Sequence, residues 1–175
     1  MIILYIILGL VAVVLIVPLF LKKDYAVVKE ILIEKPKQQV FDYVKLLKNQ
    51  DNYSVWALMD PNMKKGFSGI DGTAGCISTW ESLHKNVGTG EQEIKGIKEG
   101  ERIDYELRFL KPFKSTSLAF MTTEAVSENQ TRVKWGFSGK MNYPMNLMLL
   151  FMNMEAAIGK DFNTGLGNLK SILEK

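Results

Sequence analysis

The stretch ERIDYELRFL, residues 101–110, decides how most of this chain folds. Apolar side chains occupy every second position from Ile103 to Phe109, and every position between them carries a charge. Successive side chains of a β-strand point to opposite faces, so this alternation predicts a strand with one buried face and one solvated face. Such a strand is typical of an antiparallel sheet that is covered on one side. The charged row expected on the solvated face is Asp104, Glu106 and Arg108.

The same two-residue period continues on both sides of this stretch, over residues 63–141. Glycine-rich or polar turns, such as residues 69–72 and 127–130, interrupt it at intervals that suit short hairpin connections. A separate stretch, Tyr25 to Ile33, is also rich in β-forming residues. The predicted strands are 25–33, 63–69, 76–83, 87–98, 101–110, 115–127 and 131–141.

Helices are predicted between the first two strands and after the last one. Pro36 suits the first turn of a helix, and residues 49–56 predict a second short helix before the break at Asp60. After Pro144, apolar residues recur at steps of three and four as far as Leu173. This spacing predicts a helix of roughly 30 residues whose single apolar stripe covers the sheet.

The N-terminal segment from Ile2 to Leu21 contains no charged side chain. At a rise of ~1.5 Å per residue, a helix of this length would cover roughly 30 Å, which is the hydrocarbon thickness of a bilayer. A cleaved signal peptide and a buried core helix are the alternatives. The start lacks a basic residue and the exit, residues 17–21, is bulky, so we predict a transmembrane anchor over residues 1–23. Lys22 and Lys23 favour a cytoplasmic position for the domain formed by the remaining residues, 24–175.

The composition of the chain excludes several classes of site. The formal net charge is +3, and lysines alternate with acidic residues instead of clustering, so we expect no nucleic-acid partner. Cys76 is the only cysteine, which excludes an internal disulfide and a cysteine-cluster metal site. His84 is the only histidine, which removes the usual zinc sites and a Ser-His-Asp triad. We therefore expect no metal and no other cofactor.

Three stretches of the domain carry a resemblance to a known family. Residues 31–44, ILIEKPKQQVFDYV, are similar to an opening strand followed by a proline-led helix. Residues 88–94, GTGEQEI, together with 101–103 and 107–113, are similar to a central hairpin, and residues 159–170 to the end of a long helix. Together they resemble the START-like, or SRPBCC, superfamily, which includes polyketide cyclase-like proteins and the major birch pollen allergen. The likeness covers nearly all of the domain, and no stretch contains a catalytic signature.

This resemblance implies the helix-grip fold, an α+β arrangement in which a curved antiparallel sheet of about seven strands wraps around a long C-terminal helix. It also implies an apolar cavity between the sheet and the helix, where family members bind lipids, hormones, polyketides or other hydrophobic ligands. Some family members are cyclases or dehydratases. Typical members are soluble, so the apolar N-terminal segment departs from the family pattern.

The inward-facing apolar residues of the sheet and the helix are the candidate ligand site. Apolar pockets with a few polar groups are how proteins bind small hydrophobic molecules. Four methionines near the start of the predicted helix, Met145, Met148, Met152 and Met154, would suit an adaptable mouth. The alternative is that all of these residues form an ordinary filled core. The predicted cavity-lining residues are Trp80, Tyr105, Leu107, Phe109, Trp135, Phe137, Phe151, Met154, Ile158 and Phe162.

The leading hypothesis is a membrane-anchored START-like domain that binds a hydrophobic small molecule or a lipid. Tyr105 or Trp80 would orient a polar group of the ligand. One alternative is a polyketide cyclase or dehydratase, which would need an acid–base pair inside the cavity. Tyr105 is the only titratable residue expected there, and His84 is expected in a surface turn, so no catalytic residue is predicted. The other alternative is a non-catalytic module that presents a surface to a neighbouring membrane protein.

Overall fold

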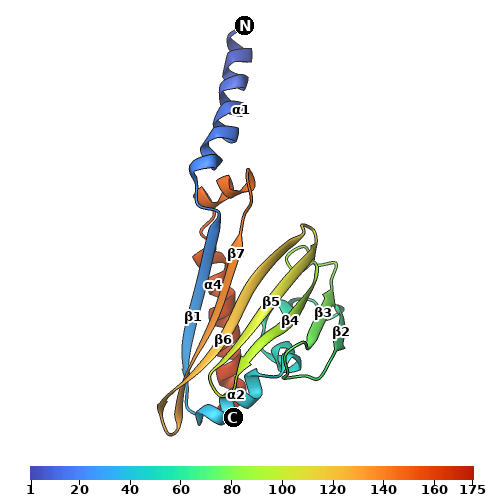
Figure 1. Ribbon diagram of the computed structural model, residues 1–175, viewed down its shortest axis with the longest axis vertical. Coiled ribbons are helices and arrows are strands. Elements are labelled where there is room, and N and C mark those ends of the chain that lie inside the picture. Colours follow the sequence, from blue (N-terminus) through green and yellow to red (C-terminus); the bar gives the residue numbers. More distant parts are fainter.

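The structure is a computed structural model that describes all residues from Met1 to Lys175. Seven strands form one antiparallel sheet in the order β1-β7-β6-β5-β4-β3-β2, and this sheet curves around the C-terminal helix α4 (Figure 1). This arrangement confirms the predicted helix-grip fold. The strands are β1 (Asp24–Ile33), β2 (Lys64–Ser68), β3 (Ile77–Glu81), β4 (Thr89–Lys98), β5 (Arg102–Lys111), β6 (Ser115–Ser127) and β7 (Gln130–Lys140).

Helical segments precede, connect and follow the strands. Pro36 stands at the N-cap of α2, whose buried residues Val40, Phe41 and Val44 recur at helical spacing. The predicted second short helix is divided into a 3₁₀ turn and a short α-helix. The segments are α1 (Ile2–Phe20), α2 (Lys37–Val44), η1 (Leu47–Asn52), α3 (Val55–Met59), η2 (Met145–Leu150) and α4 (Met154–Leu173), of which η1 and η2 are 3₁₀ helices.

The alternating stretch that predicts the sheet forms β5, and its charged row lies on the outer face. The guanidinium of Arg108 forms ion pairs with Glu91 and Glu93 of the neighbouring strand β4 and with Glu106 of its own strand. The Nη1–Oε2 distance to Glu93 is 2.8 Å. Hydrogen bonds from Arg108 and Lys95 hold the pKa of Glu93 below its ordinary value. The row is a partly exposed ion-pair cluster, as the alternation predicts.

Helix α4 begins later than the apolar spacing predicts. The prediction of one helix of roughly 30 residues is wrong, because α4 contains 20 residues and starts at Met154. The side chain of Asn153 accepts a hydrogen bond from the backbone N–H of Ala156 at 3.0 Å and so caps the helix. Asparagine is among the residues that helix N-caps prefer, since its side chain pairs with an otherwise free amide. The residues before this cap form the separate helix η2.

Most of the hydrophobic core lies in the half of the sheet away from α1. The β1–β7 register pairs Asp24 with Lys140 at the end near α1 and Ile33 with Thr131 at the other end. Helix α2 closes that other end, as Figure 1 shows. No residue of α1 belongs to the core cluster, so residues 24–175 contain a complete core of their own. The cluster is Val27, Ile33, Val40, Phe41, Val44, Leu47, Tyr53, Cys76, Ile94, Ile103, Tyr105, Ala119, Met121, Val133, Trp135, Phe162, Leu166, Leu169 and Leu173.

Helix α1 projects away from the sheet and covers none of it (Figure 1). Only Pro18 is buried among its residues, Val17 is partly buried, and the rest are exposed. The helix is long and apolar enough to cross a membrane. Between its last residue, Phe20, and the start of β1 at Asp24 there are three residues. The domain therefore lies directly beside the end of this helix.

Gly88 allows the β3–β4 loop to approach the end of β5. Its φ is +66°, and a Cβ at this position would lie 2.2 Å from the carbonyl oxygen of Lys111. Gly100 has a similar φ of +72°, but its nearest neighbour would be 3.7 Å away. Both alanine variants lose about 1–2 kcal/mol to the left-handed backbone, and only Gly88→Ala also forces two backbone segments apart.

We therefore expect Gly88→Ala to lower the free energy of unfolding by clearly more than Gly100→Ala does. Urea denaturation of residues 22–175, followed by circular dichroism, measures both variants. Equal losses would show that the loop does not approach β5 as closely as the structure places it.

Candidate functional site

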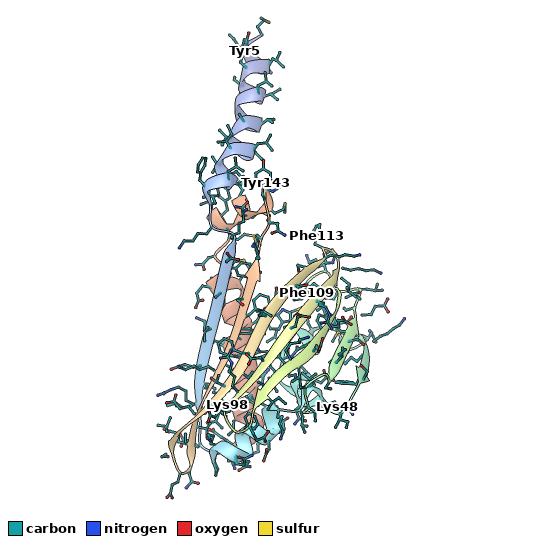
Figure 2. The ribbon with its side chains drawn as sticks, in the orientation of Figure 1. Tyr5, Lys48, Lys98, Phe109, Phe113 and Tyr143 are labelled. Atoms are coloured by element: carbon teal, nitrogen blue, oxygen red, sulfur yellow. The ribbon has the colours of Figure 1, made fainter.

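A cavity of about 340 Å³ lies between the inner face of the sheet and the first half of α4. It occupies the half of the sheet near α1, where Trp80 pairs with Gly90 and Gly90 pairs with Phe109. Figure 2 shows Phe109 in the part of β5 nearest α1, just below the turn that carries Phe113. Of the 24 residues in its lining, 14 are hydrophobic. The volume is at the lower end of the roughly 300–1,000 Å³ that ligand sites occupy.

Aromatic rings form the wall of the cavity between β7 and α4. Trp135 stacks on Phe162 with ring centroids 4.6 Å apart and an angle of 13° between the planes. The edge of Trp56 meets both rings, at centroid distances of 6.4 and 5.7 Å. Trp80 and Phe109 form a further edge-to-face pair at 6.0 Å on the β3–β5 side. All three tryptophans of the chain therefore line this one cavity.

Small side chains on β6 leave the space that the cavity occupies. The inward positions of β6 near α1 are Ser115, Ser117 and Ala119. Farther along the same face, Met121 and Thr123 are buried in the filled half of the domain. Bulky rings such as Trp80, Phe109 and Trp135 line the same space together with these small residues. The change from small to large residues along one strand face thus separates the hollow half from the filled half.

Most of the residues predicted to line a cavity do so in the structure, and three do not. Tyr105 is 1% exposed and lies in the core beyond the lining, and Met154 packs against the core without reaching the cavity. Phe151 is 82% exposed because it precedes the cap of α4, so its place on the predicted helix stripe is wrong. The predicted residues in the lining are Trp80, Leu107, Phe109, Trp135, Phe137, Ile158 and Phe162.

The segment between α2 and β2 supplies lining residues that the sequence reasoning missed. Leu47 and Gln50 come from η1, Ser54 and Trp56 from the α3 turn, and Met63 from the loop before β2. Helices this short contain too few turns for a periodic pattern to identify their buried face. The large ring of Trp56, in the short apolar run of residues 55–59, was the available signal.

Two buried polar groups near the cavity lack a hydrogen-bond partner. They are Nε2 of Gln50, in the cavity lining, and Oη of Tyr105. Burial raises the pKa of Tyr105 well above its ordinary value, and the nearby Gln50 amide opposes this rise only in part. Tyr105 therefore stays protonated in the core at neutral pH, and Nε2 of Gln50 is a donor in the cavity lining without an acceptor. A buried donor without a partner costs about 1–3 kcal/mol, so a bound acceptor would remove that cost.

The titratable groups in the lining do not form an acid–base pair aimed at a substrate. They are Tyr25, Asp51 and Lys65, and Asp51 forms an ion pair with Lys65 at 2.9 Å. His84 lies in the β3–β4 loop outside the lining, where its Nδ1 accepts a hydrogen bond from the backbone of Asn86. No group of three His, Cys, Asp or Glu side chains lies close enough together to hold a metal ion. The arrangement can enclose an apolar molecule and donate hydrogen bonds to it.

Comparison with known proteins supports the fold alone. No family model and no curated protein matches the chain. A structure of a Nitrosospira multiformis protein has a TM-score of 0.60 at 16% identity, with 84% of this chain and 94% of that chain covered. The Aha1 dimer of Colwellia psychrerythraea has a TM-score of 0.57 at 14% identity, with 86% and 96% covered. The protein Ara h 8.0201 has a TM-score of 0.54 at 11% identity, with 86% and 95% covered. At these identities the similarities show that the helix-grip fold recurs in these proteins.

Proposed function

We propose that this chain is a membrane-anchored START-like domain that binds a hydrophobic small molecule or a lipid between its sheet and α4. The observation that carries the proposal is the cavity of about 340 Å³ with all three tryptophans in its wall. Removal of apolar surface from water supplies roughly 25 cal/mol per Å², so enclosure in such a site favours an apolar ligand. Ara h 8.0201 and the Aha1 dimer share the fold in which this cavity forms.

The polar groups of the site suggest one further property of the ligand. Gln50 presents to the cavity a side-chain donor that has no acceptor. A ligand that carries a carbonyl or another acceptor on an apolar body would satisfy this donor. A hydrocarbon without such a group would leave the Gln50 donor unpaired and bind less tightly.

Helix α1 supports the membrane part of the proposal. It is apolar throughout and leaves only three residues before the domain begins. A span over residues 1–23 would hold the ligand-binding domain, residues 24–175, next to the phase in which hydrophobic ligands dissolve. Lys22 and Lys23 follow the span, and the positive-inside tendency favours the cytoplasmic side for the domain.

Tryptophan fluorescence gives a direct test of ligand binding, because all three tryptophans line the cavity. A nitroxide-labelled fatty-acid methyl ester is titrated into residues 22–175 in the absence of detergent. We expect the quenching to saturate at one equivalent of probe. Unlabelled ester should compete with the probe and reverse the quenching. Quenching that rises linearly without saturation, or no quenching at all, would contradict the proposal.

Gln50→Leu is expected to stabilise the empty protein and to weaken binding of the ester. Leucine removes a buried donor that lacks a partner, which should raise the free energy of unfolding by about 1 kcal/mol. The same change removes a hydrogen bond to the ester carbonyl, so the ester should bind roughly tenfold more weakly. Urea denaturation and the quenching titration measure the two effects.

A nitroxide-labelled alkane is the control ligand, and its affinity should not fall. Gln38→Leu is the control variant, because Gln38 lies on the surface and donates to Asp42. Equal loss of affinity for the ester and the alkane would show that Gln50 does not contact the polar group.

A further inference from the structure

The chain between β7 and α4 exposes an unusual density of apolar side chains. Residues 141–154, MNYPMNLMLLFMNM, contain no charge between Lys140 and Glu155. They include helix η2, and the side chain of Phe151 is 82% exposed. Apolar residues scattered singly over a surface need no explanation, but a contiguous patch marks an interaction site. The exposed members of this patch, which we call the η2 patch, are Met145, Met148, Leu150, Phe151 and Met152.

Hydrogen bonds fix the η2 patch to the end of helix α1. The side-chain amide of Asn146, which is fully buried, donates to the carbonyl oxygen of Pro18 at 2.8 Å. The hydroxyl of Tyr143 donates to the carbonyl oxygen of Leu15 at 3.0 Å. Figure 2 shows Tyr143 beside the lower end of α1, where the helix meets the domain. Pro18 lies in the last turn of α1, where carbonyls lack the regular intrahelical donors, and Leu15 lies about one turn earlier. These contacts therefore join the two segments at a defined level.

We propose that the η2 patch lies in the interfacial layer of the bilayer that α1 spans, and this inference rests on the proposed anchoring by α1. The Asn146 and Tyr143 contacts place the patch at the level where α1 would leave the hydrocarbon. An uncharged apolar segment at that level removes its surface from water by lying among the lipid headgroups and upper acyl chains. Tyrosine is enriched at the same depth, because its ring is apolar and its hydroxyl is polar. The bilayer is thus the partner of this surface.

Two membrane contacts would fix the orientation of the domain. A single helix joined to a domain by three residues allows rotation about the helix axis, whereas a second contact beside it opposes tilting. The hollow half of the sheet is the half nearest α1, so the cavity lies in the part of the domain closest to the bilayer. The exposed side chain of Phe113, in the β5–β6 turn, lies at the same end (Figure 2). A ligand dissolved in the bilayer would then reach the cavity over a short path.

Electron paramagnetic resonance on spin-labelled full-length chain tests the position of the η2 patch. Single cysteines replace Phe151, Met148, Val11 and Ile70 in turn, in a Cys76→Ala background. Ile70 is 75% exposed and lies in the β2–β3 loop at the far end of the sheet. The labelled chains are reconstituted into vesicles of phosphatidylcholine and phosphatidylglycerol at three to one. Collision rates with oxygen, which concentrates in lipid, are compared with those of a water-soluble nickel chelate.

We expect labels at Phe151 and Met148 to collide with the nickel chelate several-fold less often than the label at Ile70. The label at Val11 should be the least accessible to the chelate. If Val11 lies in lipid while both η2 labels behave like Ile70, the inference is overturned and the anchor stands. If Val11 is also accessible to the chelate, anchoring by α1 itself fails and the inference fails with it. Ligand binding in the cavity is measured separately, so neither outcome decides it.

Discussion

Replacement of Ala119 by phenylalanine is expected to abolish binding of the apolar probe while the domain stays folded. Ala119 lies on the inner face of β6, in register with Phe137 of β7 and Tyr105 of β5, and it lines the cavity. A ring at this position would extend into the space of about 340 Å³ where the ligand is proposed to bind. In a filled core such an enlargement costs about 1–3 kcal/mol, and here the empty space can accept the ring.

The quenching titration with the nitroxide-labelled ester measures this effect, and we expect the affinity to fall by at least about tenfold, equivalent to 1.4 kcal/mol. Leu118→Phe is the matched control, because Leu118 is the next residue on β6 and is 57% exposed on the outer face. Its affinity should equal that of the unchanged chain. Unchanged binding by Ala119→Phe would show that the probe sits elsewhere.

Phe41→Ala is expected to cause the largest loss of stability among the single changes considered. The ring of Phe41 is completely buried in α2, which closes the filled half of the sheet. Truncation of a buried phenylalanine to alanine costs about 3–5 kcal/mol, since it leaves a void that the surroundings fill only in part. A domain of this kind has a total stability of about 5–15 kcal/mol, so the loss is a large share of it.

Phe109→Ala is the comparison that makes this prediction informative. Phe109 faces the cavity and is packed on fewer sides, so its truncation should cost less than about 2 kcal/mol. Urea denaturation of residues 22–175 gives both values. Losses of equal size would show that the two halves of the domain are packed alike, which would contradict a hollow half.

The sheet could be predicted from the sequence because its strands are half buried. The period of two over residues 115–127 gives the bounds of β6, and the alternation that includes Ile103 and Tyr105 gives the buried face of β5. These patterns follow from local geometry, since each strand has one apolar and one solvated face. Strand order then follows from short hairpin connections, with β1 beside β7 as the one long-range pairing.

The error over the length of α4 has a physical cause. Apolar residues continue at helical spacing before Asn153, so the pattern alone extends the helix to residue 144. The spacing shows where apolar side chains recur, but it does not show which other part of the protein covers them. Phe162 packs against Trp135 of the sheet, whereas the side chain of Phe151 is largely exposed. Asparagine is a preferred N-cap residue, so Asn153 is a local signal that favours a helix beginning at residue 154 over a longer helix.

The candidate site could be predicted only in part. Trp135 and Phe162 lie on a regular strand and a regular helix, and the periodic pattern of apolar residues identifies the inner face of each element. Gln50 and Trp56 come from short helical turns, whose position depends on tertiary packing and not on any period. The empty space itself arises from the small residues of β6. A sequence alone does not predict that small residues leave a cavity, because this depends on which residues lie opposite them in the fold.

Mass spectrometry of protein purified directly from cells most directly tests the central claim, that the cavity binds a hydrophobic molecule. Residues 22–175 are expressed and purified without detergent, extracted with organic solvent, and compared with the Ala119→Phe variant prepared in the same way. The account predicts about one equivalent of a hydrophobic molecule per chain in the unchanged protein and little or none in the variant. A folded protein with no such molecule, in which the nitroxide-labelled ester also fails to quench the tryptophans saturably, would contradict it.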